Sequence, residues 1–126
     1  MARGTKTRDD NDTIDYAFSV TQNSTNQSPT TDTAIDITGA SMIAITADST
    51  ATANTSDDMD LNVITSFDNS TYDDGASAGG IYTSKNFGDA DVVTFVVTPG
   101  PKWMKLRLDE NNSGAASVTV NVVVTW

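Results

Sequence analysis

Acidic and amide side chains, which could bind a metal ion, gather in three short stretches of this 126-residue sequence: 57–60, 68–74 and 109–112. Hard cations such as Ca²⁺ prefer oxygen ligands of this kind. None of the three stretches has the spacing of an EF-hand loop, which needs acids at alternate positions, a central Gly and a final Glu. Asp and Asn also stabilise turns by bonding to their own backbone. We therefore predict that these stretches form turns, and we expect no metal ion and no cofactor.

The commonest catalytic side chains are missing. The sequence has no His and no Cys, which excludes Ser-His and Cys-His nucleophile pairs and removes the usual zinc ligands. A pair of carboxylates, as in glycosidases, remains available for catalysis. Because the chain has 17 acidic residues, any one pair of them says little. The sequence predicts a protein that is not an enzyme.

Four aromatic side chains could stack on the apolar face of a sugar, with Asp and Asn nearby to bond its hydroxyls: Tyr72, Tyr82, Phe87 and Trp103. The other interpretation is structural. Phe87 and Tyr82 would close the ends of a β-sandwich, and Trp103 would cover one sheet. We favour the structural interpretation and keep carbohydrate binding as an alternative function.

Basic residues concentrate on one predicted strand. Lys102, Lys105 and Arg107 lie there beside Trp103, and together the four form a basic and aromatic stripe in an acidic sequence. Arg and Trp are enriched in protein interfaces, so the stripe could bind a partner. It could equally be an outward strand face paired with neighbouring Asp, or Lys residues that protect a sheet edge. Both interpretations stay open.

The N-terminal segment is basic, whereas the chain as a whole has a net charge of −10. Arg3, Lys6 and Arg8 precede the first acid, and no apolar segment follows them, so we expect no secretory signal. We predict a flexible, partner-binding arm over residues 1–13 and a single domain over 14–126. The acidic body disfavours nucleic acid, which requires Lys and Arg. No apolar run approaches the ~20 residues that span a membrane.

Short runs of alternating apolar and polar residues predict half-buried β-strands. The clearest runs lie in the last third, residues 91–126, which we predict to be a three-stranded antiparallel meander. Met104, Leu106 and Leu108 form the inward face of its middle strand. We expect further strands over 14–20, 33–38, 41–47, 59–67 (with a bulge near its end) and 80–83, and loops over 22–31, 48–58 and 84–90. Seven or eight short strands without a helix predict an all-β protein, an antiparallel β-sandwich of jelly-roll or immunoglobulin-like topology.

Two segments look like sequence that recurs in the structural β-domains of tailed bacteriophages: Thr65–Asp73 (TSFDNSTYD) and Met104–Asn112 (MKLRLDENN). With its basic arm and its body rich in Thr, Asn and Asp, the chain resembles small virion proteins, in particular head decoration (cement) proteins. The resemblance implies a non-enzymatic protein of the capsid surface or neck, made in the host cytoplasm. It implies binding to the major capsid protein or another virion protein, as a homo-oligomer such as a trimer, to reinforce the shell. A carbohydrate-binding module on a phage tail or cell surface is the alternative.

Overall fold

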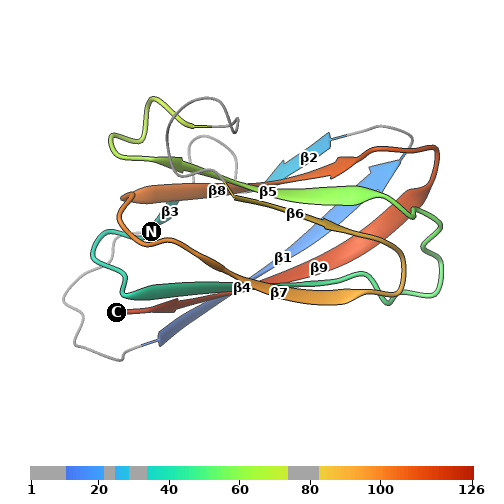
Figure 1. The fold of residues 1–126 in the computed structure, drawn as a ribbon, viewed down its shortest axis with the longest axis horizontal. Coiled ribbons are helices and arrows are strands. Elements are labelled where there is room, and N and C mark those ends of the chain that lie inside the picture. The colour runs from blue at the N-terminus through green and yellow to red at the C-terminus, as the bar shows by residue number, and fades with distance from the viewer. Residues whose placement is uncertain (1–10, 22–24, 29–33, 74–82) are drawn as a thin grey trace.

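The chain forms two antiparallel β-sheets, as seen in a computed structural model (Figure 1). The structure describes residues 11–21, 25–28, 34–73 and 83–126. None of these residues forms a helix, and hence none forms a helix that could cross a membrane. The described residues form nine strands: β1 (Asn11–Thr21), β2 (Thr25–Ser28), β3 (Ile35–Asp36), β4 (Met42–Asp48), β5 (Met59–Ser66), β6 (Thr83–Phe87), β7 (Val92–Val97), β8 (Trp103–Glu110) and β9 (Ala115–Thr125).

The strands divide into two sheets of four positions each. Sheet A has the order β1-β9-β4-β7, and sheet B has the order β2-β8-β5-β6. The short β3 also pairs with β8, on the side that β5 leaves free. Because β2 and β3 pair with successive parts of β8, they act as one interrupted edge strand.

This strand order is that of a jelly roll. β1 pairs with β9, β2 and β3 with β8, β4 with β7, and β5 with β6, so that successive pairs alternate between the two sheets. The arrangement corresponds to one long hairpin rolled into two packed sheets. The predicted all-β sandwich is confirmed, and its strand order is the jelly-roll order rather than the immunoglobulin-like one.

The predicted meander of the last third is wrong. β7 and β9 belong to sheet A, whereas β8 belongs to sheet B. The turns at 99–101 and 111–114 therefore cross from one sheet to the other instead of joining neighbouring strands. Turn residues mark where a strand ends, but they do not determine which sheet the next strand joins.

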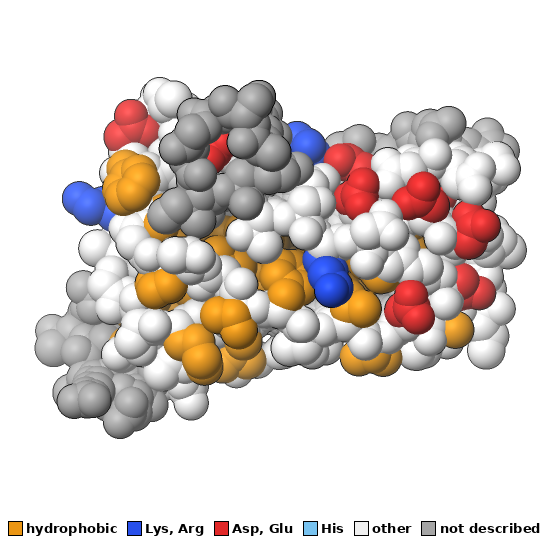
Figure 2. Space-filling view, in the orientation of Figure 1, with side chains coloured by type: hydrophobic (Ala, Val, Ile, Leu, Met, Phe, Trp, Pro, Cys, Tyr) orange, Lys and Arg blue, Asp and Glu red, His pale blue; other side chains and the backbone are white. Residues whose placement is uncertain are grey.

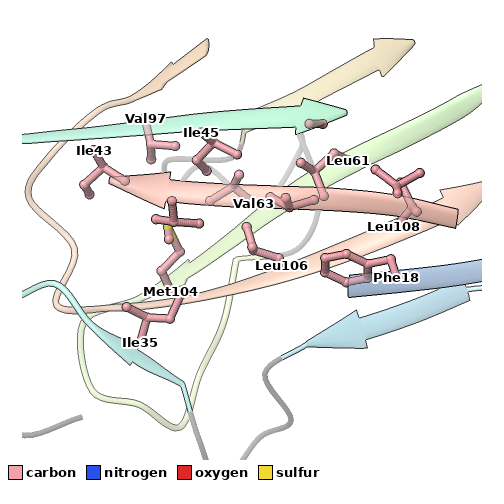
Figure 3. Packing of buried hydrophobic residues seen from close by; sticks show 14 of the residues in the cluster. Phe18, Ile35, Ile43, Ile45, Leu61, Val63, Val97, Met104, Leu106 and Leu108 are labelled. Atoms are coloured by element: carbon pink, nitrogen blue, oxygen red, sulfur yellow. The ribbon is translucent and has the colours of Figure 1, made fainter. Parts of the chain in front are cut away.

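Alternation along the strands forms the core between the sheets. Met104, Leu106 and Leu108 of β8 are fully buried, as the alternation predicts. Figure 3 shows them on the same side as Leu61 and Val63 of β5, facing side chains of sheet A. Burying a side chain of this size contributes about 1.5–3 kcal/mol relative to leaving it exposed. Other large, fully buried side chains of the described residues include Phe18, Ile37, Ile43, Ile45, Met59, Val97 and Val118.

Two polar strands escape the sequence prediction. β2 lies inside the predicted loop 22–31, and β6 occupies residues 83–87, most of which are predicted as a loop. Neither the TNQS of β2 nor the TSKN of β6 contains an apolar residue that could reveal an alternation. Backbone pairing with β8 and with β5 places them in sheet B. Most of the predicted strand 80–83 lies outside the described residues.

β5 has no bulge, contrary to the prediction. It pairs with β8 in one continuous register from Met59 to Ser66. The apparent change of phase arises because Ile64 is buried on the outer face of sheet B while Val63 is buried in the core. A strand that is covered on both faces loses the simple alternation.

The domain begins earlier than predicted. β1 starts at Asn11, within the segment assigned to the arm, and Asn11 lies opposite Thr125. The indole Nε1 of Trp126 donates a hydrogen bond to Asp12 Oδ2 at 2.8 Å. Residues 11–13 therefore belong to sheet A, and the rest of the predicted arm, residues 1–10, lies outside the described residues.

Candidate interaction surface

Three residues of the basic and aromatic stripe, Trp103, Lys105 and Arg107, lie on β8, which has strand neighbours on both sides, and Lys102 directly precedes this strand. The three side chains on β8 therefore lie on the outer face of sheet B and do not protect a sheet edge, so the edge interpretation is wrong. Lys102 is exposed, while Trp103 is half-buried. Arg107 Nε is 3.3 Å from Asp109 Oδ2, as the salt-bridged interpretation expects. The four residues do not form one open surface.

Lys105 is only 5% exposed, because the segment after β5 folds back over it. Its Nζ lies 3.7 Å from the centre of the Tyr72 ring, a cation–π contact. The Tyr72 hydroxyl donates a hydrogen bond to Asn69 Oδ1. Burial raises the pKa of Tyr72, and the nearby Asp68 charge adds to this. Lys105 thus stabilises the folded segment and is not free for a partner.

Asp68 stabilises the turn that places Tyr72 against Lys105. Its Oδ1 accepts hydrogen bonds from the backbone N–H groups of Thr71 (2.8 Å) and Ser70 (2.9 Å), and from the Ser66 hydroxyl (2.9 Å). These bonds, that of Thr71 first, lower the pKa of Asp68. Asn69 adopts a φ of 59°, which Asn tolerates better than most residues. Asp68 therefore stabilises a turn, as predicted for this acidic stretch.

The other two acidic stretches meet at one end of the sandwich. Asn86 Nδ2 donates to Asp58 Oδ1 (2.7 Å) and Asp60 Oδ1 (2.8 Å), and Asn111 Nδ2 donates to Asp58 Oδ1 (3.2 Å) and Asp60 Oδ2 (2.7 Å). The Asn86 bond, followed by that of Asn111, lowers the pKa of Asp58. Amide N–H groups thus occupy the positions that a cation would need. No group of three or more acidic residues in the described part of the chain is arranged to hold a metal ion.

The candidate sugar-binding aromatics that the structure describes lie in different surroundings. Phe87 is buried in the core, which confirms the structural interpretation for this residue. Tyr72 contacts Lys105, and Trp103 lies on β8 opposite Ser66 of β5. Tyr82 lies outside the described residues, so the Tyr72–Tyr82 pair is not placed.

A hollow of about 250 Å³ lies where β1 and β9 meet the segment before β5, with Val20, Ala116 and Asn54 among its lining residues. Its most polar group is the Asn54 amide. Nδ2 donates to the carbonyl oxygens of Ser49 (2.7 Å) and Ser117 (3.1 Å), and Oδ1 accepts from the Ser117 N–H (2.8 Å). β4 pairs with β9 only as far as Thr119, and the Asn54 side chain bonds to the backbone of β9 at Ser117, directly beyond this point. None of the residues that line the hollow is charged.

The outer face of sheet A, which we call the sheet A face, carries fewer charged residues than the described outer face of sheet B. Thr46 and Thr94 meet there with their hydroxyl oxygens 2.9 Å apart. Among the outward positions of its four strands only Asp15 and Asp48 are charged. The remaining positions are Asn11, Thr13, Ala17, Ser19 and Thr21 of β1, Ala115, Ser117, Thr119, Asn121, Val123 and Thr125 of β9, Met42, Ala44 and Thr46 of β4, and Val92, Thr94 and Val96 of β7.

The sequence carries a signal for this face. Thr119, Asn121 and Thr125 alternate with the buried valines of β9, and none is charged. Recognising the whole face also requires knowing that β1, β4 and β7 lie beside β9, which follows only from the topology. The predicted partner-binding residues Arg3, Lys6 and Arg8 lie outside the described residues. No family model matches the sequence, and no curated protein matches it.

Proposed function

We propose that this protein is a non-enzymatic virion structural protein of the decoration (cement) type, which binds a viral shell and stabilises it. The observation that supports the proposal best is the sheet A face, which carries two charged residues in a chain with 17 acids and seven bases. Charged residues are depleted at the centres of protein interfaces, because burying them unpaired is costly. A broad, weakly charged face on an acidic protein suits contact with another protein.

The architecture supports the same function. Jelly rolls occur in viral capsid domains, and also in lectins. The sheet A face is presented by four paired strands with a filled core behind them, so it is preorganised and loses little conformational freedom on binding. In this proposal the face lies against the major capsid protein or another virion protein. The basic residues 3–8 add electrostatic attraction to an acidic shell.

Co-sedimentation with capsids tests the proposal. The capsids are assembled from the major capsid protein encoded in the same genome, and dye access to their DNA on heating reports their stability. The full chain is expected to pellet with them and to raise their opening temperature. Thr119→Lys, which places a charge on the sheet A face, should weaken binding about tenfold or more, equivalent to about 1.4 kcal/mol. Ser84→Lys, at an exposed position of β6 in sheet B, should bind as the unmodified chain does.

Equal capsid binding by the two lysine variants would contradict the role of the sheet A face. A chain that fails to bind capsids but binds an immobilised glycan would instead support the alternative carbohydrate-binding module. That result should then be sensitive to substitution of Tyr72 or Trp103 and insensitive to Thr119→Lys.

A further inference from the structure

β7 is an unprotected edge strand. It lies at the end of sheet A, and within the described residues it pairs only with β4. Its sequence, VVTFVV, has no charge and no Pro. The outward Val92 and Val96 are 59% and 60% exposed, two of the most exposed large apolar side chains of the described residues. Figure 2 shows hydrophobic side chains gathered where β7 and its neighbours lie in Figure 1.

The other edges carry the features that natural sheets use to avoid pairing with further strands. β6 places Lys85 on its core-directed side, in phase with the buried Phe87, yet Lys85 is exposed. A charge that points inward from an edge strand blocks a further strand. β2 is only four residues long, and β1 carries Asp12 and Asp15. β7 has none of these features over its six residues.

An exposed, apolar, uncharged edge is a ready template for another strand. We propose that β7 pairs antiparallel with β7 of a second copy of this chain, about a two-fold axis at Thr94, so that sheet A continues through both copies. The strand is nearly self-complementary in this register. Val92 lies opposite Val96 of the second copy, Val93 opposite Phe95, and Thr94 opposite Thr94. Apolar pairs and Thr–Thr pairs are favourable cross-strand neighbours.

Charge selects this partner geometry. The exposed Asp89 and Asp91 precede β7, and the exposed Lys102 follows it. In antiparallel pairing, the N-terminal end of each β7, which follows Asp89 and Asp91, lies near the C-terminal end of the other β7, which precedes Lys102. Parallel pairing would instead place the two acidic ends side by side, which is unfavourable. Each copy has a net charge of −10, so two copies repel each other. Contact through the uncharged β7 keeps this repulsion small.

Sedimentation equilibrium of the full chain tests the association. The expected mass is twice the 13.3 kDa of the chain, and the dimer should strengthen as salt rises, because salt screens the repulsion between acidic bodies. Val92→Lys with Val96→Lys should give the mass of a single chain, because in this register the two lysines of each copy would lie directly opposite those of the other, and like charges there are destabilising. Ser84→Lys, on the protected edge strand β6, should remain dimeric. A single-chain or trimeric mass for the unmodified protein would overturn the proposal.

Cross-linking tests the register, and it is unambiguous because the sequence has no Cys. Directly opposite residues have Cβ atoms about 4.5–5.5 Å apart, close to disulfide range. Thr94→Cys should form a disulfide-linked dimer by itself. Val92→Cys and Val96→Cys should cross-link when the two variants are mixed and much less when each is oxidised alone. Equal cross-linking of the separate variants, or of Ser84→Cys, would overturn the register.

The dimer does not depend on the proposed virion function, and the two can fail separately. Capsid binding by a protein that remains a single chain would overturn the dimer and leave the virion role standing. If Val92→Lys with Val96→Lys abolished capsid binding by such a single chain while Thr119→Lys did not, the occupant of β7 would be a capsid strand. A dimer without capsid binding would overturn only the virion role.

Discussion

The ammonium nitrogen of Lys105 lies 3.7 Å from the centre of the Tyr72 ring, although only Lys105 belongs to a strand of sheet B. Lys105 is on the central strand β8, and Tyr72 is in the segment that follows β5. Lys105→Met keeps much of the buried stem but removes the charge. We expect the free energy of unfolding to fall by about 1–2 kcal/mol, the range for a partly desolvated cation–π contact. Urea denaturation measures this loss.

Two further substitutions separate the ring contact from the hydroxyl bond. Tyr72→Phe keeps the ring over Lys105 and loses only the bond to Asn69, so it should cost less than Tyr72→Leu. In a double-mutant cycle, Lys105→Met and Tyr72→Leu should be coupled by about 0.5 kcal/mol or more. Additive effects of the two substitutions would contradict a direct interaction.

The Lys105 environment also shows what alternation can and cannot predict. The period of two correctly separates Lys105 from the core residues Met104 and Leu106. It cannot show that a segment more than 30 residues earlier returns to cover the outward side, because that contact depends on the Asp68 turn. The sequence therefore predicts which side chains of β8 point outward, but it does not predict which of them are exposed.

The strands themselves were predictable where burial imposed a pattern. β9 alternates because Val118, Val120, Val122 and Val124 all face the core. The polar β2 carries no such pattern, because backbone hydrogen bonds to β8 suffice to place it. Sheet membership was not predictable either, since neighbours such as β1 and β9 lie at opposite ends of the chain. The sheet A face depends on that pairing.

The register of β9 can be tested with adjacent substitutions. Val120 is fully buried, whereas Thr119 is exposed on the sheet A face. Val120→Asp should unfold the domain, because it buries an unpaired charge. Thr119→Asp should change the free energy of unfolding by about 0.5 kcal/mol or less. Circular dichroism during urea denaturation compares the two, and similar losses would mean that the two faces are assigned wrongly.

Acid should destabilise the protein through its turn carboxylates. Hydrogen bonds lower the pKa of Asp48 (from the Thr50 hydroxyl first), Asp58 (from Asn86) and Asp68 (from the Thr71 N–H). A carboxyl whose pKa is lower in the folded state stabilises the fold above the unfolded pKa of about 3.9. This stabilisation is lost as the pH falls through the folded pKa. The melting temperature should therefore be nearly constant above about pH 5 and fall below about pH 4.

Asp68→Asn isolates one contribution to this acid sensitivity. It should lower the melting temperature at pH 7 and reduce the further fall between about pH 5 and pH 3, because the amide does not titrate. Asp89→Asn, at an exposed position outside these turns, is the control and should leave the pH profile unchanged. A profile of Asp68→Asn that parallels the unmodified protein would show that this carboxyl does not stabilise the turn.

Calcium should not change the stability. The oxygens of Asp58 and Asp60 accept N–H groups from Asn86 and Asn111, so a cation would have to displace these donors. Melting curves with a chelator and with millimolar Ca²⁺ should coincide. A rise of several degrees in Ca²⁺ would show that the ion binds the folded state, by the linkage between binding and stability. The carboxylate end of the sandwich would then be a metal site after all.

Removing residues 1–10 should separate binding from folding. The shortened chain keeps Asn11, whose Oδ1 accepts a bond from the Thr125 hydroxyl (2.8 Å), and Asp12, which accepts one from Trp126 (2.8 Å). Its melting temperature should stay within a few degrees of the full chain, because β1 is intact.

Capsid co-sedimentation should nevertheless weaken, because the shortened chain lacks Arg3, Lys6 and Arg8. The same loss is expected when these three residues are replaced by Gln in the full-length chain, which tests charge without changing length. Binding of the unmodified chain should weaken as salt rises, since exposed charges are screened beyond about 10 Å at 0.1 M. This salt response is opposite to the one expected of the β7 dimer, so one titration distinguishes the two contacts. Undiminished, salt-independent capsid binding by the shortened chain would show that residues 1–10 contribute nothing and that the contact rests on the sheet A face alone.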